Sequence, residues 1–89
     1  MQLHTIADIT GDSAAHQLAV AARVFFIGAT GGVLRVGDIN VSATQGVNVA
    51  QNTAITLVPD GSDITSKYPT GTVYVYVPSG ATASISYGI

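Results

Sequence analysis

Residues 72–87 read TVYVYVPSGATASISY and carry the clearest structural signal in the chain. Valine alternates with tyrosine over residues 73–77, which is the period of a strand with one buried face. Residues 78–80 (Pro-Ser-Gly) form a turn sequence, and residues 81–87 again favour strand. The stretch therefore predicts a closing β-hairpin and points to an all-β fold.

The rest of the chain is rich in β-branched residues, with turn sequences at intervals of about 8–12 residues. The strands expected from these patterns cover residues 3–9, 17–27, 33–36, 47–50, 53–58, 72–77 and 81–87. The number and spacing of the strands predict a small all-β domain spanning residues 1–89, a β-sandwich or jelly-roll-like barrel of about seven or eight short strands.

Several segments need a choice between structures. Residues 13–22 (SAAHQLAVAA) have a helix-friendly composition, but alternation is continuous over residues 17–27. We favour a long strand there, with a single helical turn before it as the alternative. Residues 24–27 and 33–36 are expected to form a hairpin. Residues 39–44 are either a short strand or an ordered loop, and residues 59–63 (PDGSD) are a turn.

The composition predicts a chain that packs against neighbours. Its 89 residues include no cysteine, so neither disulfides nor thiolate metal sites support so small a core. Charged residues make up 9% of the chain, against about 25% in an ordinary soluble domain. Lysine, which often protects exposed sheet edges, occurs only at Lys67. We therefore expect a homo-oligomer or a subunit held in a larger lattice.

The same composition argues against several classes of partner. A net charge of −2 with three basic residues cannot line a phosphate-binding face, so we expect no nucleic acid. No apolar run approaches the roughly 20 residues of a membrane-spanning helix, so we expect no membrane partner. The first residues lack the basic start and apolar stretch of a signal peptide, so export by that route is not expected.

The glycine-rich residues 26–32 (FIGATGG) are similar to the turn that holds a dinucleotide pyrophosphate at a helix N-terminus. That motif needs a helix after the glycines, whereas residues 33–37 favour strand. We interpret the segment as the turn of a hairpin.

Two groups of polar side chains have the residue types of a metal site. One recurs at every fourth position, at His4, Asp8, Asp12 and His16. That spacing gathers ligands only on a helix, so in a strand-rich segment we interpret them as unrelated surface positions. The other, Asp60, Ser62 and Asp63, lacks the further acidic positions of a calcium loop. With no nucleophile elbow and no glutamate either, we expect neither enzymatic activity nor a metal or cofactor.

Tyr74 and Tyr76 share one face of their predicted strand because the side-chain period is two. Tyrosine is enriched at interfaces, so the pair is a candidate contact patch for protein or carbohydrate. The alternative is that both rings cover one side of a thin sandwich with their hydroxyls in water. The sequence favours neither interpretation.

Residues 35–46 (RVGDINVSATQG) carry a resemblance to a known group of proteins. The run is similar to a segment of small proteins encoded within the structural-gene blocks of tailed bacteriophages. In those proteins a closing Y-V-Y…G…Y-G pattern follows, and this chain matches it over residues 74–88. The match covers chiefly residues 33–46 and 72–88.

The resemblance implies a virion component, and the role it favours is that of a head decoration (cement) protein. Such a protein is made in the host cytoplasm and sits on the outer surface of the capsid, bound to the major capsid protein, often as a trimer. Within the shared segment, Arg35 and Asp38 can form a charge pair that holds the turn at Gly37. We take Tyr74, Tyr76, Arg35 and Asp38 as candidate protein-contact residues.

Two other functions compete with capsid decoration. The first is a neck, tail or fibre-associated subunit of the same particle. The second is a carbohydrate-binding adhesion module that presents tyrosines, with the candidates Tyr68, Tyr74, Tyr76 and Tyr87.

Overall fold

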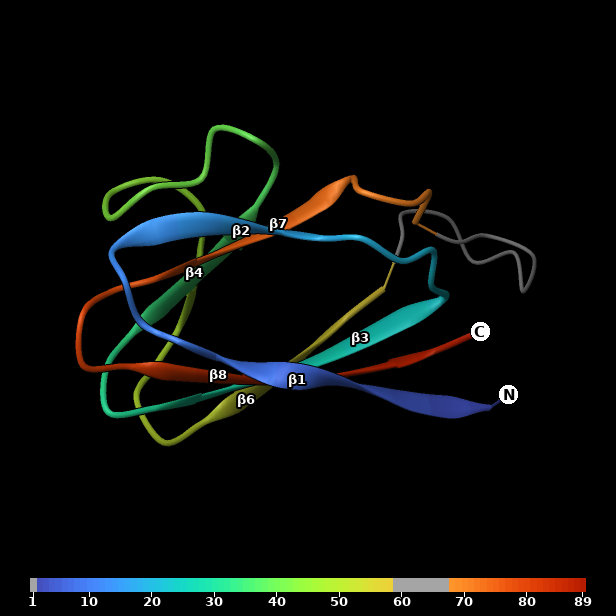
Figure 1. The fold of residues 1–89 in the computed structure, drawn as a ribbon, viewed down its shortest axis with the longest axis horizontal. Helices are drawn as coiled ribbons and strands as arrows, with labels where there is room; N and C mark the ends of the chain where they lie inside the picture. Colours follow the sequence, from blue (N-terminus) through green and yellow to red (C-terminus); the bar gives the residue numbers. More distant parts are fainter. Residues whose placement is uncertain (1, 59–67) are drawn as a thin grey trace.

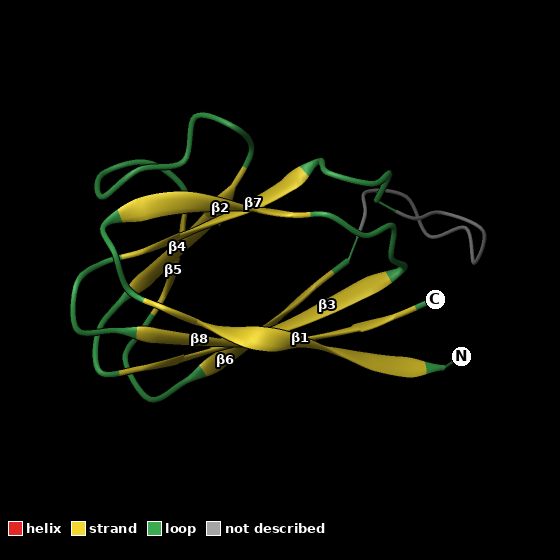
Figure 2. Cartoon of the chain, in the orientation of Figure 1, coloured by secondary structure: helices red, strands yellow, loops and turns green. Residues whose placement is uncertain are grey.

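The computed structural model describes residues 2–58 and 68–89, and within them the chain forms strands and loops without a helix (Figure 2). The strands are β1 (Leu3–Thr10), β2 (Ala14–Leu18), β3 (Val24–Thr30), β4 (Leu34–Gly37), β5 (Val47–Val49), β6 (Ala54–Leu57), β7 (Val73–Val77) and β8 (Thr82–Gly88). The predicted all-β class is confirmed.

The strands make two four-stranded sheets, which Figure 1 shows as two packed layers. Sheet A has the order β1-β8-β3-β6, and sheet B has the order β2-β7-β4-β5. The paired strands are antiparallel throughout. This two-layer arrangement is the predicted β-sandwich.

The pairing follows a simple rule along the chain. The first strand pairs with the last, β2 with β7, β3 with β6 and β4 with β5. The chain is thus one long antiparallel ribbon, doubled back at β4–β5. Rolling this ribbon brings β8 beside β3 and β7 beside β4. An eight-stranded double sheet of this connectivity is a jelly roll.

The core lies between the sheets and is almost entirely aliphatic. In β7, Val73, Val75 and Val77 are buried, whereas Tyr74 and Tyr76 are partly exposed on the outer face. The strands of sheet A contribute Phe25, Ile27, Ala29, Ala83 and Ile85, and those of sheet B add Leu18, Leu34, Val36 and Val49. Because successive side chains of a strand point to opposite faces, each strand directs one set of side chains into the core and the other set outward.

The closing stretch does not form the predicted hairpin. Strand β7 lies in sheet B between β2 and β4, and β8 lies in sheet A between β1 and β3. Residues 78–81 do turn, with the amide of Ala81 donating to the carbonyl oxygen of Pro78 at 3.1 Å, but the turn crosses from one sheet to the other. Alternation marks the buried face of each strand. Alternation alone does not distinguish two strands that are paired side by side in one sheet from two strands that face each other across the core.

The predicted hairpin of residues 24–27 and 33–36 is also absent, for the same reason. Strand β3 belongs to sheet A and pairs with β6 and β8, whereas β4 belongs to sheet B. The connections β1–β2, β3–β4 and β7–β8 lie together at the end of the sandwich away from the C-terminus (Figure 1). Their backbones touch: a Cβ on Gly11 or Gly31 would overlap the carbonyl oxygen of Pro78 or Gly80.

The predicted long strand over residues 17–27 is in fact two strands in different sheets. Along it the buried side chains include Leu18 and Ala22 at even positions, then Phe25 and Ile27 at odd positions. The chain leaves sheet B after Leu18, and the parity changes at the start of β3 in sheet A, where Val24 and Phe25 are both buried. Residues 14–18 are strand, so the alternative of a helical turn is wrong as well.

The remaining predictions concern a loop, a strand and a turn. Residues 39–44 form a loop, and the strand at residues 3–9 is confirmed as β1. The turn predicted at residues 59–63 lies outside the described residues. The edge strands have protection that the scarcity of lysine does not reveal: β1 changes register between Ile6 and Ile9, and β5 is 3 residues long.

Candidate functional site

The outer face of sheet B carries a row of polar and aromatic side chains across three neighbouring strands. Arg35 of β4 lies directly opposite Asn48 of β5 and, on its other side, opposite Tyr76 of β7. Arg35 and Tyr76 alternate with buried residues, and Asn48 is paired directly with Arg35, so all three side chains stand on the outer face of the sheet. The row exists only because the rolled ribbon places β4 between β5 and β7.

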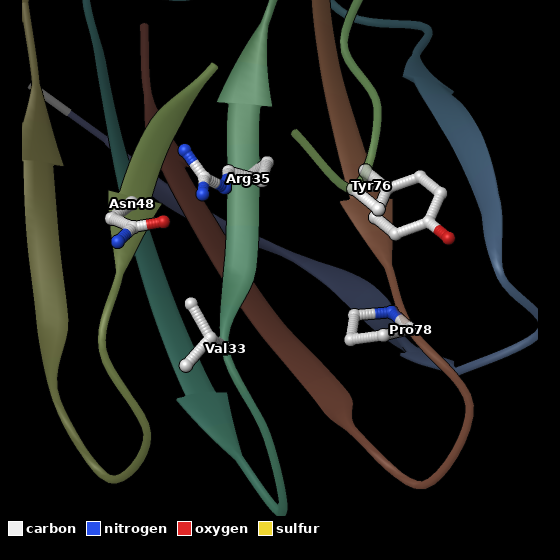
Figure 3. Close-up of a pocket in the computed structure, with 6 residues that line it drawn as sticks. Val33, Arg35, Asn48, Tyr76 and Pro78 are labelled. Atoms are coloured by element: carbon white, nitrogen blue, oxygen red, sulfur yellow. The ribbon is translucent and has the colours of Figure 1, made fainter. Parts of the chain in front are cut away.

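A groove of about 310 Å³ surrounds this row. Its walls add apolar side chains to the polar ones: Val33, Ala43 and Pro78. Figure 3 shows Arg35 between Asn48 and Tyr76, with its guanidinium turned toward Asn48 and the Tyr76 hydroxyl pointing away from it. The Tyr76 ring is therefore a wall of the groove, whereas Arg35 and Asn48 supply its hydrogen-bond donors.

Arg35 is tied to the loop that follows β4. One of its terminal nitrogens donates a hydrogen bond to the carbonyl oxygen of Gly46 at 3.1 Å. Gly46 has a φ of 122°, and a Cβ there would lie 2.7 Å from Cγ2 of Val41 and 3.0 Å from the carbonyl oxygen of Val36. Only glycine lets the end of the loop approach β4 this closely, so Gly46 helps to orient the guanidinium.

The loop of residues 38–46 is held by its own contacts. The amide of Asn40 donates to Oδ1 of Asp38 at 2.9 Å, which is an Asx-type turn, and Val41 is buried beneath the loop. The predicted charge pair between Arg35 and Asp38 is wrong, because each side chain has a different partner. The reason is local: Asp38 follows the strand end and satisfies the backbone of its own turn.

The four candidate contact residues therefore do not form one cluster. Tyr76 and Arg35 are brought together as direct cross-strand neighbours, and both line the groove. Tyr74 shares their face but lies opposite Gly37, farther along the strand. Asp38 stands at the exposed end of β4, in the loop. The outward placement of both tyrosines is confirmed; their role as a contact patch stays a prediction.

The other two tyrosines are partly buried and pack against the core in an aromatic cluster. The ring of Tyr87 stacks on His4 with centroids 5.3 Å apart, and it lies 6.2 Å from Phe25. Tyr68 lies 5.7 Å from Phe25. A shared tyrosine surface of all four residues is therefore absent, because two of them pack inward and two point outward.

The fourfold His and Asp spacing produces one contact. Nε2 of His16 and Oδ1 of Asp12 lie 2.8 Å apart, so the interpretation of these positions as unrelated is wrong for this pair. His4 instead stacks on Tyr87. Within residues 2–58 and 68–89, no three His, Asp or Glu side chains gather as metal ligands. The other candidate metal group, Asp60, Ser62 and Asp63, lies outside the described part of the chain.

The glycine-rich residues 26–32 complete a strand and then cross between the sheets. Residues 26–30 belong to β3, and Gly31, with a φ of 74°, begins the connection to β4. Strand rather than helix follows the glycines, so the feature that a dinucleotide motif requires is missing here. The segment is an inter-sheet connection and not the predicted hairpin turn.

A second hollow, of about 390 Å³, lies over sheet A between β3, β6 and β8. Its lining is made of small or uncharged residues, namely Gly28, Ala29, Thr30, Asn52, Thr53, Ala54 and Ser84. It offers no charge to hold a ligand, so the groove on sheet B is the better candidate site. No helix long and apolar enough to cross a membrane occurs in the described chain.

Sequence reasoning missed several groove residues, above all Asn48. Nothing in the pattern of residues 47–50 marks the asparagine as functional, since polar residues normally occupy the outer positions of a strand. Its significance comes from the register that sets it opposite Arg35. Val33 was predicted to begin a strand and Pro78 to lie in a turn, and only the pairing of β4 with β7 brings them to the same groove. Comparison of the chain with protein-family models, with curated proteins and with solved structures found no match.

Proposed function

We propose that this chain is a structural subunit of a bacteriophage particle, a capsid decoration protein that binds the major capsid protein through the outer face of sheet B. The supporting observation is the meeting of the two segments that carry the resemblance to phage structural proteins. They are far apart in sequence, yet β4 from the first pairs with β7 from the second, and Arg35 faces Tyr76. Two segments that serve one contact have to lie side by side in the fold, as β4 and β7 do.

The chemistry of this surface supports a role in contacts. Val33, 42% exposed, lines the groove with Arg35 and Tyr76, and Ile39, 69% exposed, lies in the loop that follows β4. Exposed apolar side chains close to aromatic and arginine residues are typical of the centre of protein interfaces. A structural role of this kind needs no catalytic group, and the proposal assigns none.

The fold agrees with the proposal but does not carry it. Jelly rolls serve in viral capsid proteins and in lectins alike, so the function has to be argued from the surface. In a capsid lattice the low charge of the chain would be an advantage, because few ionic groups would lose water when repeated subunits pack together.

The test is cosedimentation of the purified protein with phage heads assembled without it. We expect saturable binding on the order of hundreds of copies per head, as repeated lattice sites imply. Substituting Tyr76→Ala should weaken binding, whereas Phe26→Ser on the outer face of sheet A should leave it unchanged. Protein that stays in the supernatant beside intact heads would refute capsid decoration. A handful of copies per virion would instead place the subunit in the neck, tail or fibre.

A second candidate function is carbohydrate binding at the same groove. It is favoured by the placement of an aromatic ring, Tyr76, beside the planar polar side chains of Arg35 and Asn48. A glycan array probed with the oligomerised protein separates the two. Signal that disappears in Asn48→Ala would support the adhesion function, and an array without signal would remove it.

A further inference from the structure

Arg35 is a cation without a carboxylate partner in the described chain. Among the described residues, the only hydrogen bond of its side chain goes to the neutral carbonyl of Gly46, which orients the guanidinium and leaves its charge uncompensated. Asp38, the nearest acid in sequence, accepts from the amide of Asn40 instead. Arginine presents five N–H groups in a planar fork, so a single bond leaves most of its donors available.

The surroundings of this cation resemble a binding site more than a solvated strand surface. Arg35 is only partly exposed, and the Tyr76 ring and the side chains of Val33, Ala43 and Pro78 enclose the same groove. Asn48 stands directly opposite Arg35, so its amide adds a second donor at the guanidinium side (Figure 3). A charged fork, an amide and apolar walls favour a planar anionic group attached to an apolar body.

We propose that the groove receives a carboxylate side chain of an extended partner segment whose neighbouring residues are apolar. This inference rests on the proposed function and names the chemistry by which the partner docks. The carboxylate lies between Arg35 and Asn48, and the flanking apolar groups contact Val33, Pro78 and the Tyr76 ring. Because Gly46 already holds the guanidinium, little side-chain freedom is lost when the carboxylate binds.

The size and charge of the site decide between occupants. A volume of about 310 Å³ is at the lower limit for ligand pockets, and it matches one or two side chains or a single sugar ring better than a longer glycan. A single arginine is not enough to bind a polyphosphate backbone, because such a backbone is held by several cations. An isolated carboxylate on a peptide matches the one available charge.

The direct test is an NMR titration of the full chain with two short peptides, acetylated and amidated. One holds a glutamate between two valines, and its twin holds glutamine instead. We expect saturable shifts of the Arg35 Nε–H and the Asn48 side-chain amide with the glutamate peptide, and about tenfold weaker binding of the twin. Equal binding of both peptides, or no saturable shift, would overturn the inference.

Matched variants separate the site from general charge effects. Arg35→Gln should weaken binding of the glutamate peptide about tenfold or more, whereas Arg23→Gln, which removes the same charge elsewhere on the surface, should not. Arg35→Lys, which keeps the charge but not the planar fork, should bind the peptide with intermediate affinity. It serves as a second variant if Arg35→Gln disturbs the loop. If inorganic phosphate or methyl glucuronide binds more tightly than the peptide, a partner carboxylate side chain is the wrong occupant.

Cosedimentation distinguishes failure of this inference from failure of the proposed function. If Arg35→Gln binds phage heads as well as the wild type and Arg23→Gln do, the groove is not the docking element, although the capsid role stands. If the wild type itself does not bind heads, the capsid role fails, and the peptide titration still decides whether the groove accepts a carboxylate.

Discussion

The carboxylate of Asp12 and the imidazole of His16 lie 2.8 Å apart, Oδ1 to Nε2, at the connection that carries the chain from sheet A to sheet B. Asp12 belongs to that connection, and His16 lies on the edge strand β2. The contact therefore links a connecting segment to the strand it leads into. Both side chains are partly exposed, so the pair is in contact with water.

The first prediction concerns this pair. The hydrogen bond with His16 is the main cause that lowers the pKa of Asp12 below its ordinary 3.8, and the charge of His16 and the amide of Ala14 act in the same direction. Because the pKa is lower in the folded chain, the resulting stabilisation is present above about pH 3.8 and is lost as the pH falls through the folded value. His16→Ala should raise the pKa of Asp12, as measured by carboxyl carbon NMR. Gln17→Ala serves as the control, and an unchanged titration in His16→Ala would contradict the assignment.

The second prediction concerns the glycines of the inter-sheet connections. A Cβ on Gly11 would overlap the carbonyl oxygen of Pro78, and backbone atoms cannot move aside without disturbing both connections. We expect Gly11→Ala to lower the free energy of unfolding by about 3 kcal/mol or more. Gly80 has a φ of 88° with open space around it, so Gly80→Ala should cost only about 1 kcal/mol of backbone strain. Urea denaturation measures both, and equal losses would argue against the close approach at Gly11.

The third prediction concerns His4, whose Nε2 is buried and has no hydrogen-bond partner within residues 2–58 and 68–89. A buried nitrogen that loses water without gaining a partner destabilises the fold, whereas the ring itself stacks on Tyr87. His4→Phe keeps a stacked ring and removes the nitrogen, so we expect a gain of about 1 kcal/mol in unfolding free energy. His4→Ala should instead lose about 1 kcal/mol through the missing ring contact. Losses of similar size in both variants would show that the nitrogen has a partner in solution.

The fourth prediction tests the strand connectivity directly. In the sandwich, Val75 pairs with Val36 and Ala83 pairs with Ala29. Backbone NOEs should therefore join these pairs. A closing hairpin of residues 72–87 would instead bring the backbones of Val75 and Ala83 side by side. NOEs between those two backbones would refute the crossing of β7 and β8 between the sheets.

The candidate site could be predicted only in part. Outward placement of Tyr74 and Tyr76 followed from the two-residue period of a strand, which depends on local geometry alone. The proximity of Arg35 to Tyr76 depends on the pairing of β4 with β7, which are separated by more than thirty residues of chain. The predicted Arg35–Asp38 pair was wrong because the Asp38 carboxylate instead accepts a hydrogen bond from a backbone amide of its own turn. Spacing in the sequence does not reveal this competing partner.

The amino-acid sequence by itself determined the all-β class and most of the strand positions, and in β7 it determined which side chains face the core. These properties follow from β-branched alternation and from turn residues, both of which act over a few neighbouring positions. Tertiary structure alone decided which strands become neighbours. The apolar face of a strand is buried equally well whether the next strand pairs with it in a hairpin or lies in the opposite sheet. Strand pairing therefore depends on the packing of the whole chain. That choice turned residues 72–87 from a predicted hairpin into a crossing between the sheets, and it created the groove in which Asn48, Arg35 and Tyr76 meet.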